Sequence, residues 1–130
     1  MSSPHGPANE YLRPAVRWSG TIPDADKEKA APNAGVITWH EPFAELWAAW
    51  ELGTVPRVDF ESYFVVVVTG PYGADLCHLM VLGEGRGSAV FKGGLEADRQ
   101  GSSFSFSIGV FPRAGITTCH GVVVAKREAS

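Results

Sequence analysis

The chain has 130 residues, of which 45% are hydrophobic, and its formal net charge is −3 at pH 7. This length allows one domain with a real core, and the apolar content argues against wholesale disorder. The negative charge, with lysines and arginines scattered along the chain, argues against a protein built to bind nucleic acid or a membrane surface.

The sequence shows no recognisable signal peptide and no apolar run long enough for a membrane span. The first residues show no basic stretch followed by an apolar one, which would indicate a signal peptide. The longest apolar run, 64–68, is too short to span a bilayer. We therefore expect no membrane span and a cytoplasmic location, with an extracytoplasmic one as the alternative if a signal has been removed.

Residues 1–33 hold five of the nine prolines and few large apolar side chains. Prolines at this density work against regular strand pairing. We predict a flexible or loosely docked arm at 1–33, followed by a single globular domain at 34–127. Trp18 is an exception within the arm and gives it one place at which to dock.

One helix is predicted at about residues 42–52. Pro42 suits the first helical position, and Gly53 suits the left-handed position after the last turn. The spacing i, i+3, i+4 and i+7 predicts one apolar helical face that docks on the rest of the domain. That face consists of Phe43, Leu46, Trp47 and Trp50.

The remaining chain predicts strands joined by short turns. The valine-rich run at 63–68 favours a strand that is covered on both faces. The alternation at 102–110 predicts a strand with its phenylalanines inward and its serines on a solvated surface. Further strands are expected at 36–39, 75–82, 88–92 and 116–125.

These elements together predict an α+β fold. The turn residues between the β runs indicate short connections, which antiparallel strands allow. We expect one amphipathic helix packed on a curled, mostly antiparallel sheet of five or six strands, in the form of a small sandwich or open barrel.

Each of the two cysteines is followed by a histidine, in Cys77-His78 and Cys119-His120. Adjacent side chains of a strand point to opposite faces, so neither dipeptide readily aims both side chains at one ion. A zinc site needs four converging ligands, and no typical ligand spacing is present. We favour two buried thiols that act as small hydrophobic residues.

Two alternatives remain for these residues. A disulfide between Cys77 and Cys119 requires facing positions and an oxidising compartment. A metal-binding or hydrolytic enzyme would use His78 and His120 with Cys77 or Cys119. Whether the two strands are neighbours decides which side chains face one another.

Other motifs of catalysis are weak in this sequence. GxSxG does not occur, and the glycine-rich 83–87 precedes a short strand rather than a helix, so a hairpin loop is favoured over a phosphate site. No catalytic residue and no cofactor are expected. Asp59 and Arg113 stand next to apolar runs, and we hypothesise that they form a structural ion pair between strand ends.

The segment FAELWAAWELGTVPRVDFESYFVVVVTG, at 43–70, contains a Leu-Trp helix, a linker with proline, and VDF before a run of valines. It resembles the family that contains the C-terminal domain of the protease-complex subunit PrcB and related small uncharacterised bacterial proteins. Residues 104–121 are similar to some of these relatives. The resemblance implies a small β-rich domain without established catalytic residues, often exported or lipid-anchored, and linked in the named member to supporting a protease complex. Asp59 and Phe60 match the motif as structural positions.

The sequence therefore favours a non-enzymatic interaction or accessory domain, with a protein as the expected partner. Loops on a rigid sheet carry recognition in many proteins. The expected contact residues are Trp18, Trp39, Tyr72 and Arg86. Besides the enzyme, a carrier that holds a small apolar ligand between sheet and helix is an alternative.

Overall fold

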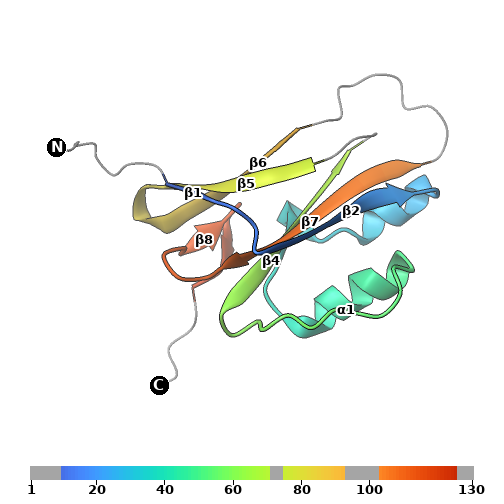
Figure 1. Ribbon diagram of the computed structural model, residues 1–130, viewed down its shortest axis with the longest axis horizontal. Coiled ribbons are helices and arrows are strands. Elements are labelled where there is room, and N and C mark those ends of the chain that lie inside the picture. The colour runs from blue at the N-terminus through green and yellow to red at the C-terminus, as the bar shows by residue number, and fades with distance from the viewer. Residues whose placement is uncertain (1–9, 71–74, 93–102, 126–130) are drawn as a thin grey trace.

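The computed structural model describes residues 10–70, 75–92 and 103–125. This part of the chain forms two sheets and one α-helix, α1 (His40–Ala49) (Figure 1). Three short 3-10 helices join them, namely η1 (Ala25–Ala30), η2 (Asn33–Gly35) and η3 (Gly83–Gly85).

The strands belong to two sheets, sheet A and sheet B. In spatial order, sheet A consists of β1 (Glu10–Leu12), β5 (Asp75–Leu82), β6 (Arg86–Lys92), β8 (Thr118–Cys119) and β9 (Val122–Val123). In the same order, sheet B consists of β2 (Val16–Ile22), β7 (Phe104–Pro112), β4 (Tyr63–Gly70) and β3 (Val36–Ile37). The strand pairs are antiparallel except β6 and β8, which are parallel.

The α+β class with mostly antiparallel strands is confirmed, whereas the single curled sheet is wrong. The nine strands of the described residues divide into sheets of five and four, and neither sheet closes on itself. Extra strands arise from two places. Residues 10–22 supply β1 and β2, and the single strand expected at 116–125 is a hairpin of β8 and β9.

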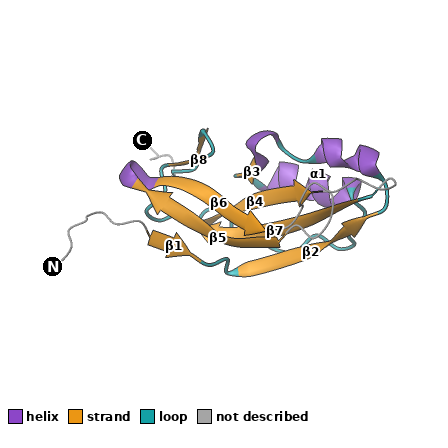
Figure 2. Ribbon diagram, turned by 90° about the horizontal axis from the view of Figure 1, so that it is seen from above, coloured by secondary structure: helices purple, strands orange, loops and turns teal. Residues whose placement is uncertain are grey.

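Sheet B forms the middle layer of the molecule, and α1 lies along one of its faces (Figure 2). The strand β4 shows how both faces are covered. Val65 and Val67 belong to the core cluster that contains the apolar face of α1, while Phe64 and Val66 belong to the cluster shared with sheet A. The prediction that this strand is covered on both faces is therefore confirmed.

The arm predicted at 1–33 is wrong for residues 10–33, which are built into the fold. β2 pairs with β7 along seven residues, and β1 pairs with β5. The prolines do not prevent this pairing because Pro14, Pro23 and Pro32 stand outside the strands, where no ladder hydrogen bond is lost. Residues 1–9 lie outside the described residues.

Small residues on one face of β7 allow sheet A to pack against it. Ser105 and Ser107 are buried, so the solvated serine face expected from the alternation is wrong. The Ser107 hydroxyl accepts the backbone N–H of Leu76 at 3.1 Å. A Cβ added at Gly109 would lie 2.7 Å from Cδ2 of Leu76. The alternation is real, but its polar face meets a second sheet instead of water.

The helix α1 ends earlier than its apolar periodicity suggests. Its docking face is confirmed, because Phe43, Leu46 and Trp47 are buried. The chain leaves the helix at Glu51, which has a φ of +53°. The amides of Glu51 and Leu52 bond back to the carbonyls of Ala48 and Trp47, a pattern that ends many helices. No helix in the described ranges is long and apolar enough to cross a membrane.

The hairpin of β8 and β9 turns at His120 and Gly121, whose φ angles are +53° and +83°. Two successive positive φ values between paired strands are typical of a type I′ turn. The prediction of a single strand at 116–125 misses this turn, because the threonines and valines around it favour a continuous strand. The consequence is that β9 becomes the outer edge of sheet A.

Candidate functional site

The two Cys-His dipeptides do not meet. β6 lies between β5 and β8, so the strands that carry them are not neighbours. Cys77 stands at an irregularity in the pairing of β5 with β6, between Leu76 and His78. Cys119 is a buried free thiol, and burial raises its pKa from 9.0 to about 11. Cys119 therefore acts as a small core residue.

The two histidines make separate contacts. The ring of His78 stands edge-on to Tyr11, with 4.7 Å between the centroids. The Nε2 atom of His120 accepts the amide N–H of Ala89 at 3.1 Å, and its Nδ1 lies 2.9 Å from the carbonyl oxygen of Ala34. Since an amide can only donate, the His120 proton belongs on Nδ1. Within the described ranges, no three or more His, Cys, Asp or Glu side chains are grouped so that they could hold a metal ion.

Arg113 joins several segments through their backbones. Its Nε donates to the carbonyls of Phe60 at 2.9 Å and Tyr63 at 3.1 Å. Its Nη1 donates to Val124 at 2.7 Å, and its Nη2 to Thr38 at 2.6 Å. Partial burial lowers the pKa of the guanidinium from its ordinary value. Four carbonyl dipoles thus take the role that a carboxylate was expected to fill.

The hypothesised ion pair between Asp59 and Arg113 does not occur in the described part of the chain, whose ion pairs include Arg17 with Asp75 and Lys27 with Glu51. The Asp59 carboxylate instead accepts the amide of Glu61 at 3.1 Å, as expected at a turn. Its carbonyl accepts the amides of Ser62 and Tyr63. Asp59 therefore shapes the turn that presents the Phe60 carbonyl to Arg113.

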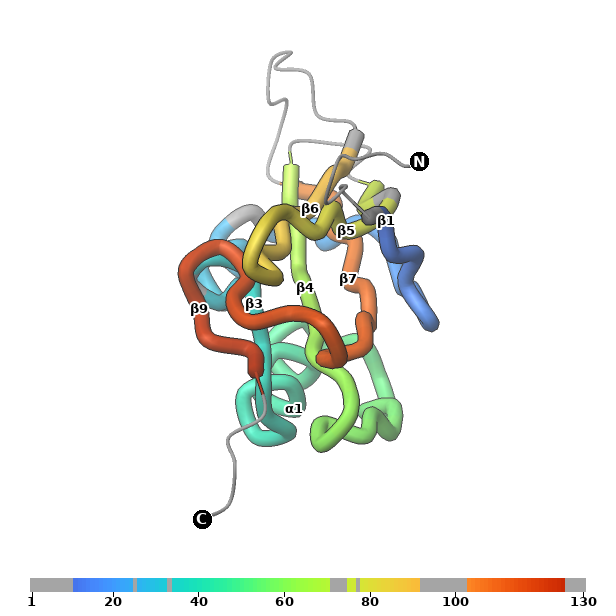
Figure 3. Tube along the Cα trace, turned by 90° about the vertical axis from the view of Figure 1, so that its left-hand side faces the viewer, coloured from blue at the N-terminus to red at the C-terminus, as the bar shows by residue number. Residues whose placement is uncertain are grey.

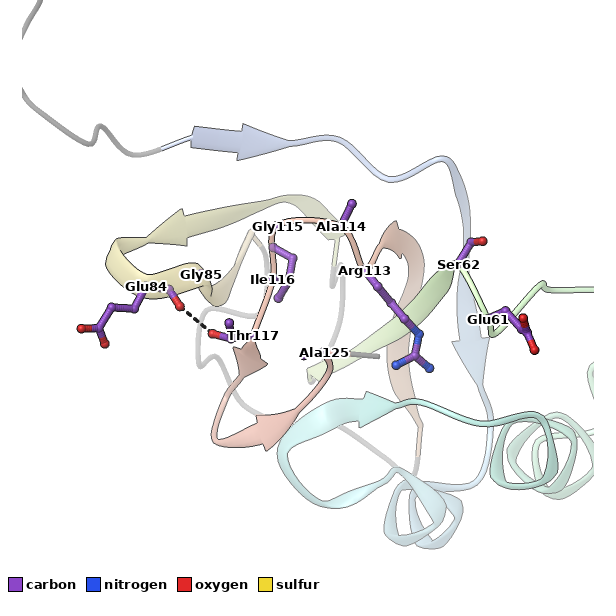
Figure 4. Close-up of a pocket in the computed structure, with 10 residues that line it drawn as sticks. All are labelled: Glu61, Ser62, Glu84, Gly85, Arg113, Ala114, Gly115, Ile116, Thr117 and Ala125. Atoms are coloured by element: carbon purple, nitrogen blue, oxygen red, sulfur yellow. Dashed lines mark hydrogen bonds between the residues drawn. The ribbon is translucent and has the colours of Figure 1, made fainter. Parts of the chain in front are cut away.

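Two adjoining clefts lie on either side of Arg113. The larger, which we call the Thr117 cleft, has a volume of about 770 Å³ (Figure 4). Figure 4 shows Glu84 and Thr117 toward one end, Glu61 toward the other, and Arg113 between them. Its lining consists of Glu61, Ser62, Glu84, Gly85, Arg113, Ala114, Gly115, Ile116, Thr117 and Ala125.

The second cleft, which we call the Trp39 cleft, has a volume of about 440 Å³. It shares three lining residues with the Thr117 cleft, so the two form one continuous surface. Its lining consists of Thr38, Trp39, Phe60, Glu61, Arg113, Val123 and Ala125. Trp39 is 60% exposed and Val123 is 69% exposed. Two large apolar side chains are thus exposed on one cleft.

The expected contact residues lie in different places. Trp39 lies on the cleft that bears its name. Trp18 is half-buried against the helix, with its ring 5.1 Å from that of Trp47. Arg86 is exposed, and its Nε donates to the Gly83 carbonyl at 3.0 Å within its own loop. Tyr72 lies outside the described residues. The structure thus places Trp39 alone of the three described residues on this cleft.

Sequence reasoning did not select Val123 as a contact residue. Within an uninterrupted strand at 116–125, alternation places Val123 on the same face as Cys119, and nothing marks that face as exposed. The available signal was His120-Gly121, since a glycine in the second position of a two-residue turn is typical of hairpins. That turn would have placed Val123 on an edge strand.

Comparisons with protein families, with curated proteins and with solved structures give no match. The function is therefore inferred from the side chains around the clefts.

Proposed function

We propose that this protein is a non-catalytic binding module that holds an extended segment of a partner protein in the Trp39 cleft. The observation that carries this proposal is the exposure of Trp39 and Val123 on one cleft, in a chain whose other tryptophans pack into the core. Aromatic side chains with this exposure are typical anchors of protein interfaces.

An extended segment suits this site better than a compact ligand. The Trp39 cleft continues into the Thr117 cleft, which gives an elongated surface. β9 is an edge strand beside it. β9 pairs with β8, with Cys119 opposite Val122 and Thr118 opposite Val123. Because the closing pair of a two-residue hairpin shares its hydrogen bonds, the N–H and C=O of Val123 point away from β8. Partner strands commonly bind at such edges.

The other functions considered have less support. The space between α1 and sheet B, where an apolar ligand would lie, is filled by a cluster of rings that includes Phe43, Trp47, Trp50, Phe104 and Phe106. The enzyme alternative requires His78, His120 and the cysteines to converge, and they lie on separated strands. The resemblance to the PrcB family favours an accessory role in a protein complex.

A random peptide library displayed on phage tests the proposal. Peptides selected on the wild-type protein are expected to lose affinity by about a factor of ten or more in Trp39→Ala, because the anchor side chain is removed. Val16→Ala is the matched control, since Val16 is also an exposed apolar residue, at 46%, but lines a different cleft. It should bind as the wild type does. A library that yields no binder, or peptides that bind Trp39→Ala equally well, would contradict the proposal.

A further inference from the structure

The two exposed residues of the Trp39 cleft come from different sheets. Trp39 lies shortly after β3, the edge strand of sheet B, and Val123 lies in β9, the edge strand of sheet A. The two strands lie side by side, yet no ladder pairs them (Figure 3). Side-chain bridges are therefore needed to fix the spacing between Trp39 and Val123.

Arg113 provides the first bridge. Its Nη2 holds the carbonyl of Thr38 at 2.6 Å, and its Nη1 holds the carbonyl of Val124 at 2.7 Å. Thr38 directly precedes Trp39, and Val124 directly follows Val123. Because the guanidinium is planar and rigid, its two terminal nitrogens set the separation of the two backbones.

His120 provides a second bridge near the other end of the same segments. From the hairpin turn, its ring contacts the Ala34 carbonyl in η2 and the Ala89 amide in β6. Ala34 lies two residues before β3, so the ring ties the hairpin to the start of that strand. The hairpin is thus held against residues 34–38 at two points that are separate in the sequence.

We propose that Arg113 and His120 are positioning residues that set the distance between Trp39 and Val123, and thereby the affinity of the cleft for its partner segment. This inference rests on the proposed function. Lysine cannot replace Arg113 in this role, because its single nitrogen cannot reach the carbonyls of Thr38, Val124, Phe60 and Tyr63 in the fork geometry of a guanidinium.

Two variants test the bridges, with the library-selected peptide as the probe. Arg113→Lys keeps the positive charge but loses the forked guanidinium that bonds several carbonyls at once. His120→Asn keeps a residue that tolerates positive φ in the turn, but its side chain is too short for both bonds. Each is expected to fold, as judged by circular dichroism, and to bind the peptide about tenfold more weakly, since one or two hydrogen bonds that hold the cleft are lost.

A readout without peptide follows the position of Trp39 itself. In protein labelled with 5-fluorotryptophan, the ¹⁹F resonance of Trp39 is assigned with Trp39→Phe. Both bridge variants should shift this resonance. Arg17→Lys is the matched control, because Arg17 also donates to a carbonyl, that of Leu76, and pairs with Asp75, but it lies in β2 on the opposite edge of sheet B. It should leave the peptide affinity and the Trp39 resonance unchanged.

Wild-type affinity in Arg113→Lys and an unmoved Trp39 resonance would overturn the inference. An equal loss of affinity in Arg17→Lys would do so as well, because the effect would then be one of general stability. If Arg113→Lys does not fold, His120→Asn decides by the same two readouts. If the library yields no peptide, the proposed function fails, whereas the ¹⁹F resonance still decides whether the bridges position Trp39.

Discussion

At the scale of single residues, His78, His120 and Cys119 make contacts that hold the fold. His120 completes two backbone hydrogen bonds, His78 contacts Tyr11, and Cys119 fills the core cluster between the sheets. From the sequence, buried thiols are favoured, with a disulfide and a metal-binding or hydrolytic site as alternatives. Strand order, which the sequence does not reveal, separates them, because β6 inserts between β5 and β8.

Cys119 leads to a pH dependence of stability. Burial raises the pKa of its thiol from 9.0 to about 11, so the unfolded chain releases this proton at a lower pH than the folded chain does. The stabilisation is complete below pH 9 and is lost as the pH rises toward 11. Over that window we expect the free energy of unfolding to fall by up to about 1.4 kcal/mol per pH unit from this group.

Urea denaturation at pH 8, 9, 10 and 11 measures this effect. Cys119→Ala is the control, because it removes the thiol while leaving the other titrating groups in place. The difference in stability between wild type and variant should shrink as the pH rises. A difference that stays constant from pH 8 to 11 would contradict the account of Cys119.

At the scale of elements, the sequence predicts the existence of most strands and of the helix. Periodicity is strong in 63–68 and 75–82, and both become β4 and β5. The misplaced helix end and the missed hairpin turn share one physical cause, since each depends on a positive φ at a residue other than glycine. Glu51 ends α1, and His120 starts the turn between β8 and β9. Local sequence patterns carry little information on such positions.

Glu51 offers a test of this helix end. Glu51→Gly should raise the free energy of unfolding by roughly 0.5–1 kcal/mol, because glycine adopts a positive φ without steric cost. The variant also loses the exposed ion pair between Glu51 and Lys27, which is 2.9 Å long. This loss offsets the gain by only about a few tenths of a kcal/mol. Glu51→Ala is the control, since it loses the ion pair without relieving the backbone. Thermal unfolding that ranks alanine above glycine would contradict this explanation.

At the scale of the whole molecule, sheet B is covered by α1 on one face and by sheet A on the other. The sequence predicts the helix-covered face, since its aromatic stripe is periodic. It does not predict the second layer, because the small residues Ser105, Ser107 and Gly109 resemble a solvated surface. They are small because β5 approaches closely, as the contact of Ser107 with the Leu76 amide shows.

Gly109→Ala tests this stacking of the sheets. The added methyl group would meet Leu76 and, at 3.1 Å, Phe111, so we expect a loss of about 1–3 kcal/mol in stability from overpacking. A double-mutant cycle with Leu76→Ala supplies the control. The cost of Gly109→Ala should fall when Leu76 is truncated, because the two side chains then no longer compete for space. Additive costs would show that the sheets are not in contact there.

The site itself was predicted only in part. Trp39 was named as a contact residue although the sequence predicts it at the end of a strand, and it lines the Trp39 cleft because β3 ends two residues earlier, at Ile37. Val123 and the bridging role of Arg113 follow from contacts between segments far apart in the sequence, such as the bond from Arg113 to Thr38. Such contacts depend on the order of strands in two sheets, which no local pattern specifies.

An NMR titration of the ¹⁵N-labelled protein with the library-selected peptide tests the central claim most directly. Binding in the Trp39 cleft predicts that the largest amide shifts occur at residues 38–39, 60–61 and 122–125, the segments that line it. The amides of β1 and β2, which lie at the other edges of the two sheets, should move little. Shifts centred on β1 and β5, with the 38–39 and 122–125 amides unmoved, would contradict it.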